Sequence, residues 1–230
     1  MRLYNNLIKE IKELLISSNK LCDGKVLKTS DRNSVILLSD TAFELGGKNK
    51  PCVTGLAVSN DITFSNSVYL LGNDLNEIKS DSPFAKFVFI QIEDFDNEQD
   101  TFDKIKELES LRYRLSVDGF MTRASALNMR EQIRVNKNAL KSGITFADYG
   151  NTLLSKYLDF AYVKSIEIYF ITDFNDFEKL NSVAKKISQT TSALNHIFDN
   201  VMFDCSTCNL KEICDEVDGL KELHLKNVKK

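Results

Sequence analysis

The stretch Lys86-Phe87-Val88-Phe89-Ile90-Gln91-Ile92 is the strongest strand signal in the chain and decides the fold class. Its residues are mostly β-branched or aromatic, and the polar Asp94 follows it. Similar short apolar runs precede it at residues 34–38, 51–58 and 67–71. Because the connections between these runs are short, we expect hairpins and antiparallel pairing rather than helical crossovers.

Apolar residues recur at helical spacing on both sides of these strands, which predicts amphipathic helices. The predicted helical segments are 3–17, 97–115, 124–141, 145–158, 174–199 and 215–228. Gly143 is placed to end the third of them, and 165–171 is a further strand. We therefore expect an α+β fold, in which a mostly antiparallel sheet packs against helices, over residues 1–200. A short cysteine-bearing helical segment that binds metal follows over 201–230.

Composition and charge exclude several classes of protein. Of the 230 residues, 43% are hydrophobic and 27% charged, as in an ordinary globular protein rather than a disordered one. The net charge is −3, so the chain lacks the cationic excess with which proteins bind nucleic acid. No apolar run approaches the roughly 20 residues of a membrane span, and the charged first helix does not have the pattern of a signal peptide. We expect a cytoplasmic protein that binds neither nucleic acid nor membranes.

Three of the five cysteines lie within ten residues of one another, at Cys205, Cys208 and Cys214. A C-x2-C pair with a third cysteine close behind favours a metal site over a disulfide framework, and thiolates select iron–sulfur clusters or zinc. The three are one ligand short of the usual four. The alternatives for the fourth are His224, Cys22, Cys52, Asp215 or a group from outside the chain. The alternative is that these cysteines bind no metal and are simply buried.

Four cations recur at intervals of seven, four and three residues: Arg123, Arg130, Arg134 and Lys137. On the predicted helix they share one face, where two or three of them could clamp the phosphates of a polyanion. The alternative is an ordinary solvated helix face. The nearby Gly46-Gly47 pair, followed by two lysines, favours a hairpin turn with positive φ over a phosphate-binding loop.

With these features in hand, the chain resembles the central region of acetyl-CoA synthase, a subunit of the carbon monoxide dehydrogenase/acetyl-CoA synthase complex. Three stretches carry the resemblance, in the same order and with similar spacing. They are Phe43–Gly47 with Lys48–Pro51 and the run through Asp74–Ile78 to Phe87–Ile92; Ile133–Ala139 with Gly143, Tyr149-Gly150, Val163 and Ile166–Asp173; and Phe203–Cys208.

The resemblance implies an α+β domain that helps to bind coenzyme A, with arginines for its phosphates. It makes Arg130 and Arg134, followed by Arg123 and Lys137, the residues expected to bind these phosphates. It also implies that the cysteine trio holds a [4Fe–4S] cluster. The chain departs from the family in its third cysteine spacing and in having no fourth cysteine after it, no C-x-C motif and no tryptophan. We therefore expect it to lack the nickel-chelating domain and not to complete acetyl-CoA synthesis alone.

Three functional hypotheses follow. The first is an acetyl-CoA-synthase-like iron–sulfur protein that binds coenzyme A or a related polyanion. If such a protein is an enzyme, it is a component of an acetyl-CoA-synthase-type acyltransferase. The second is a non-enzymatic accessory module of a CO- or corrinoid-linked complex, in which a partner subunit supplies the fourth metal ligand or the nickel site. The third is a protein that delivers nickel or iron. The residues alone assign no catalytic group.

Overall fold

The computed structural model describes residues 2–15, 20–30, 35–47, 49–95, 97–125, 130–198 and 207–228. Its helices are α1 (Asn5–Leu15), α2 (Glu98–Arg114), α3 (Lys137–Lys141), α4 (Phe146–Leu158), α5 (Phe177–Phe198), α6 (Lys211–Glu216) and α7 (Leu220–Val228), with a 3-10 turn at Leu38–Asp40. Its strands are β1 (Lys20–Cys22), β2 (Thr29–Ser30), β3 (Thr41–Leu45), β4 (Cys52–Ser59), β5 (Ser67–Leu71), β6 (Phe84–Ile92), β7 (Ser116–Val117), β8 (Phe120–Ser125), β9 (Arg130–Asn136) and β10 (Val163–Ile171). The predicted α+β class is confirmed.

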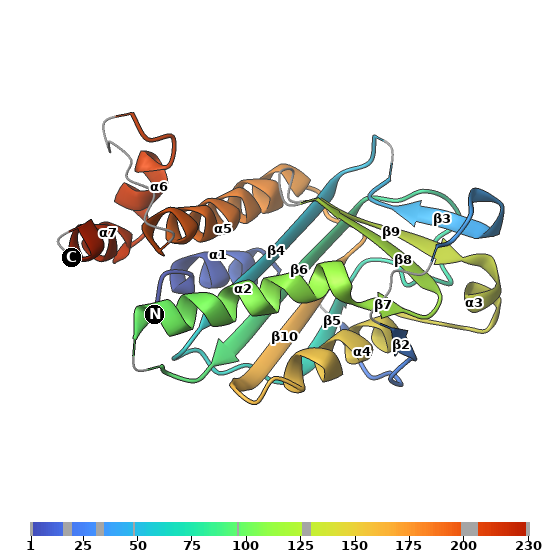
Figure 1. Cartoon of the computed structure of the whole chain (residues 1–230). Coiled ribbons are helices and arrows are strands. Elements are labelled where there is room, and N and C mark those ends of the chain that lie inside the picture. Colours follow the sequence, from blue (N-terminus) through green and yellow to red (C-terminus); the bar gives the residue numbers. More distant parts are fainter. Residues whose placement is uncertain are drawn as a thin grey trace.

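A five-stranded sheet with the order β1-β5-β10-β6-β4 forms the centre of the molecule (Figure 1). Strand β6 pairs antiparallel with β10 and parallel with β4, and β5 pairs parallel with β10. Among the described pairings of all sheets, five are antiparallel and two parallel, so the sheets are mostly antiparallel. The expectation that β4, β5 and β6 follow one another as hairpins is wrong, because β10 lies between β5 and β6.

Helices cover both faces of this sheet. On one face, Gly55 of β4 lets Phe87 pack close to Ile187 of α5. On the other face, Gly150 of α4 lies directly against Val68 and Phe170. The core therefore has α5 and α1 on one side of the central sheet and α4 on the other, and α2 extends from α5 to β8.

A second sheet, β3-β9-β8, packs on the α4 side of the central sheet. Thr54 and Lys86 of the central sheet both contact Glu131 of β9, and Phe120 of β8 lies against Tyr149 of α4. These contacts fix one face of the small sheet against the core.

Two predicted elements are wrong. The segment 124–141 is not one helix: β8 ends at Ser125, β9 spans Arg130–Asn136, and only the short α3 follows. The helix end is nevertheless where it was predicted, because Gly143 has a φ of 80° just beyond α3. The predicted strand at 34–38 is also wrong over its described residues, which lie in irregular structure and the start of the 3-10 turn.

The last described segment packs against the body of the molecule through α5. Its buried apolar residues, among them Leu210, Ile213 and Leu220, belong to the same apolar cluster as the core. The predicted helix over 215–228 is two helices, α6 and α7, and the division into 1–200 and 201–230 stays a prediction. In Figure 1 the N-terminus and the C-terminus lie at the same end of the molecule.

Candidate functional site

Buried and half-buried residues alternate along strand β9, as the strand period of two requires. Glu131, Ile133 and Val135 are buried against the core, whereas Arg130 and Arg134 alternate with them and lie half-buried on the opposite face. A separation of four residues places two side chains on one face of a strand as well as of a helix. The two arginines therefore share a face for a different reason from the one predicted.

Arg123 of β8 lies on the same face. It pairs with Gln132, which sits between Arg130 and Arg134 along β9, and cross-strand partners point to the same side of a sheet. We call Arg123, Arg130 and Arg134 the arginine face. The prediction that these residues lie on one helix is wrong, yet the β8–β9 pair places them together on one surface.

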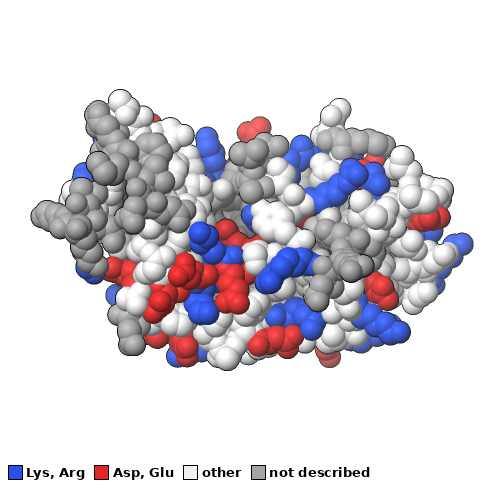
Figure 2. Space-filling view, viewed as in Figure 1, with Lys and Arg blue, Asp and Glu red and all other residues white. Residues whose placement is uncertain are grey.

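The four predicted cations differ in how far their charge is neutralised. Arg134 donates from Nε to Glu44 Oε1 at 2.5 Å and from Nη1 to the carbonyl of Ile36 at 3.3 Å. Lys137, the first residue of α3, donates to the carbonyl of Ser39 at 2.8 Å. Within the described part of the chain, Arg123, Arg130 and Lys137 have no carboxylate within ion-pair distance. Figure 2 shows Lys and Arg side chains over the region of β3 and β9, while Asp and Glu side chains gather toward the N-terminal half of α2, with Lys and Arg among them.

A hollow of about 500 Å³ opens beside Arg130. Its lining comes from the β3–β4 connection, the start of β4, β9 and the start of α5: Asn49, Lys50, Pro51, Cys52, Val53, Arg130, Phe177, Glu178 and Asn181. Arg130 Nη2 donates to the carbonyls of Gly46 at 3.0 Å and Lys50 at 3.5 Å, and so holds the connection against β9. Gly46 has the predicted positive φ, 65°, but the turn is not the predicted hairpin, because β3 pairs with β9 and β4 with β6.

Lys50 is the residue of this hollow that sequence reasoning undervalued. The turn reading of the glycine pair is correct, but the same turn carries Lys50 to the wall of the hollow beside Arg130. Like Arg130, Lys50 has no ion-pair partner among the residues described. The sequence signal for Lys50 was its position close after a glycine turn. This signal indicates a binding residue only if β9 lies next to the turn, which the sequence does not show.

Cys52 lies in the lining of the same hollow but is 8% exposed. Burial raises the pKa of its thiol, against the opposing effect of a backbone hydrogen bond at Glu131 and of the Arg130 side chain. Its thiol is therefore held neutral, so the charged groups that the hollow offers are the cations Lys50 and Arg130 and the carboxylate of Glu178.

The predicted metal ligands are only partly within the described residues. Cys205 lies outside them. Cys208 and Cys214 are half-buried: Cys208 Sγ accepts the N–H of Leu210 at 3.4 Å in the turn that leads into α6, and Cys214 lies inside α6 rather than at its start. His224 is on α7. Among the described residues, no three His, Cys, Asp or Glu side chains gather into a metal-binding group. The cysteine trio with His224 stays a prediction.

Comparison with known proteins identifies the family. The profile of the CO dehydrogenase/acetyl-CoA synthase complex beta subunit matches residues 33–177, which is more than half of the chain. The chain belongs to this family. The predicted resemblance is thereby confirmed at the level of the family, and no curated protein matches the chain.

The matched range of the acetyl-CoA synthase family divides the two predicted sites. It contains β3 to β10 and the whole arginine face, but it ends before Cys205. None of the described helices is both long and apolar enough to cross a membrane. The predicted anion site thus lies within the matched range, whereas the cysteine segment lies outside it.

Proposed function

We propose that this acetyl-CoA-synthase-like protein binds coenzyme A, or a related polyanion, at the arginine face and the adjoining hollow. The observation that carries the proposal is that Arg130 and Lys50 line one hollow, with Arg123 on the same face of the adjacent strand β8. None of these three cations has a carboxylate partner among the described residues. Phosphate groups are bound by such unneutralised guanidinium and ammonium groups, the guanidinium often through two parallel hydrogen bonds.

The two central arginines would have different roles. Arg134 is already held by Glu44 and the carbonyl of Ile36, so it stabilises the pairing of β3 with β9 more than it attracts a ligand. Arg130 uses one nitrogen to hold the Gly46–Lys50 turn and keeps other N–H groups for a phosphate. The hollow, at about 500 Å³, is within the size range of small-molecule sites.

The test is calorimetric titration of the full chain with coenzyme A, with pantetheine as the phosphate-free probe. We expect coenzyme A to bind and pantetheine not to bind, because the cations contact phosphate. The double variant Arg123→Ala/Arg130→Ala should bind coenzyme A about tenfold or more weakly, from the loss of charged hydrogen bonds. Lys164→Ala, an exposed cation on β10 outside the site, is the matched control. Equal affinity in both variants would reject the assignment.

We further propose that Cys205, Cys208 and Cys214 hold a [4Fe–4S] cluster, with His224 as the alternative fourth ligand of a zinc site. Thiolates are the ligands that such clusters take, and an N–H···S bond such as that from Leu210 to Cys208 is typical of their surroundings. When bound, a cluster with an open iron would supply Lewis-acid or electron-transfer chemistry. The chain's own contribution is to place three sulfur donors within ten residues, of which Cys208 precedes α6 and Cys214 lies within it.

Metal analysis after anaerobic purification tests the cluster proposal. We expect about four irons and four sulfides per chain, the content of a [4Fe–4S] cluster, and a loss of both in Cys208→Ser. One zinc per chain would instead indicate a structural site. The family description names a subunit of a complex, which supports a role beside partner subunits that complete the metal site.

A further inference from the structure

A groove of about 820 Å³ lies at the other end of the molecule, between the C-terminal helices and the body. One wall is the turn before α7 and α7 itself, and the other is the end of β6 with the start of α2. Its lining residues are Arg2, Leu3, Asn60, Ile92, Glu93, Asp94, Phe95, Asn97, Glu98, Thr101, Asp218, Gly219, Glu222, Leu223 and Lys226. None of them belongs to the arginine face or its hollow.

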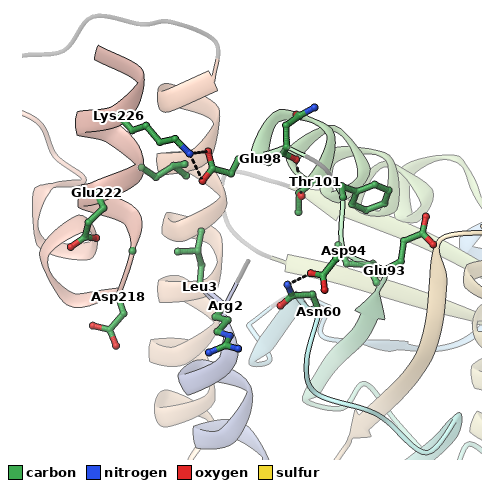
Figure 3. A pocket seen from close by; sticks show the side chains of 15 residues that line it. Arg2, Leu3, Asn60, Glu93, Asp94, Glu98, Thr101, Asp218, Glu222 and Lys226 are labelled. Carbon is green, nitrogen blue, oxygen red and sulfur yellow. Dashed lines mark hydrogen bonds and ion pairs between the residues drawn. The ribbon is translucent and has the colours of Figure 1, made fainter. Parts of the chain in front are cut away.

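The groove combines an apolar base with an acidic rim. Leu3, Ile92, Phe95 and Leu223 supply the apolar side chains, from three parts of the chain far apart in sequence. Five carboxylates and two cations supply the charge. Figure 3 shows that Asp218 and Glu222 come from the α7 side and Asp94 from the β6 side. A ligand in the groove would therefore meet negative charge from both walls.

Both cations of the groove are already engaged. Lys226 of α7 donates to Glu98 of α2 at 2.9 and 3.1 Å, a contact that links the two walls in Figure 3. Arg2 pairs with Asp61 at 3.0 Å. By contrast, the carboxylates of Glu93, Asp218 and Glu222 have no cation within ion-pair distance in the described part of the chain. The unbalanced charge of the groove is negative.

We propose that this groove docks a basic, amphipathic segment of a partner protein. Complementary charge is what selects and orients partners at protein interfaces, and a Lys or Arg in such a segment would pair with Asp218, Glu222 or Glu93. Leucine-like side chains between the cations would contact Leu223 and Phe95 at the base. The groove combines apolar side chains with carboxylates, the two kinds of contact that an amphipathic, basic peptide segment requires.

The inference goes beyond the proposed binding of coenzyme A and does not depend on it. The two sites differ in their balance of charge: the hollow beside β9 is lined by Lys50 and Arg130 with one carboxylate, Glu178, whereas the groove beside α7 is lined by five carboxylates and two cations. In Figure 2, Asp and Glu side chains gather toward the N-terminal half of α2, and Lys and Arg side chains lie over the β3 and β9 region as well as farther along α2. One chain can therefore bind an anionic ligand and a cationic partner on separate surfaces.

The experiment titrates a labelled peptide of about twelve residues with the full chain and measures the fluorescence anisotropy of the peptide. Lys and Leu are spaced in this peptide so that, in a helix, they lie on opposite faces. We expect binding that weakens as salt is raised, because exposed charges are screened within about 10 Å at 0.1 M salt. The double variant Asp218→Asn/Glu222→Gln should bind at least about tenfold more weakly, which corresponds to 1.4 kcal/mol.

Two controls separate this site from general attraction to an acidic protein. Glu13→Gln/Glu212→Gln removes the same charge from exposed positions outside the groove and should leave the affinity unchanged. A peptide with Ser in place of Leu should bind the wild-type chain more weakly, because it lacks the apolar side chains. No binding, or equal weakening in the two double variants, would overturn the proposal. Equal displacement of the peptide by spermine at matched charge would overturn it in favour of a small polycation.

Discussion

At the scale of single residues, the pair formed by Lys86 and Glu131 carries the largest energetic consequence. The Lys86 ammonium donates to Glu131, and the two side chains are 5% and 1% exposed. Because Lys86 is on β6 and Glu131 on β9, the pair joins the two sheets across the core. Removing one partner from a buried pair leaves the other charge without compensation.

We predict that Glu131→Leu lowers the free energy of unfolding by about 3–5 kcal/mol. The double variant Lys86→Leu/Glu131→Leu should lose less than this single variant, since no buried charge is left behind. Urea unfolding of the wild-type chain and of the variants measures both values. A double variant that is less stable than Glu131→Leu would contradict the explanation by an uncompensated charge.

Glu167 predicts a specific pH dependence of stability. Burial alone would raise the pKa of its carboxyl group, but hydrogen bonds from Lys12, Tyr169 and Ser65 outweigh burial and hold the pKa below the ordinary 4.5. A lowered folded-state pKa stabilises the fold above the unfolded-state value and ceases to do so as the pH falls through the folded-state value. The stability difference between wild type and Glu167→Gln should thus be largest near neutral pH and shrink as the pH falls below the ordinary pKa of 4.5 and through the lower folded-state value. A constant difference in urea unfolding would contradict this.

At the scale of elements, the sequence predicted most of the helices and strands, and its errors have a physical cause. The strands around 51–58, 67–71, 86–92 and 165–171 are confirmed because they are buried and rich in β-branched and aromatic residues. The predicted helix over 124–141 is wrong. A spacing of four residues between arginines fits both the helix period of 3.6 residues and the strand period of two, so it did not distinguish the two structures. The decisive signal was the alternation of Ile133 and Val135 with polar residues.

The arginine face and its hollow show what the sequence predicted of the site and what it did not. The sequence singled out Arg123, Arg130 and Arg134, whose positive charge is evident from the residue type alone. Lys50 joins them only because the β3–β4 turn lies against β9, a contact between segments about 80 residues apart. Such a contact depends on tertiary packing, which no local pattern records.

A glycine within α4 allows a test at this scale. An alanine Cβ at Gly150 would lie 2.8 Å from Phe170 Cε2 and closer still to Val68. Helix propensity alone favours Ala over Gly by about 1 kcal/mol, but the crowding against β5 and β10 should outweigh it. We predict that Gly150→Ala destabilises the chain by about 1–3 kcal/mol. Ser155→Ala on the same helix is the control and should be neutral or slightly stabilising; a gain at Gly150 would show that α4 can shift away from the sheet.

At the scale of the whole molecule, the strand order is the feature that sequence reasoning missed. Short connections suggested hairpins. However, β10 lies between β5 and β6 in the sheet, although 70 residues separate it from the end of β6 in the sequence. An apolar strand with two hydrogen-bonding edges is better buried in the middle of a sheet than left at its side. The local sequence of β10 shows that it is a buried strand but not which neighbours it takes.

The C-terminal helices provide the last prediction, because their apolar side chains continue the core. Leu220 of α7 is fully buried in the same cluster as the central sheet, whereas Leu225 on the same helix is 56% exposed. If this segment and the body form one cooperative unit, Leu220→Ala lowers the stability of the whole chain by about 2–5 kcal/mol in a single transition. Leu225→Ala, the matched control, should change it by no more than about 0.5 kcal/mol. Calorimetry that resolves two transitions, with only the weaker one shifted by Leu220→Ala, would show instead that the helices beside the acidic groove unfold independently of the sheet.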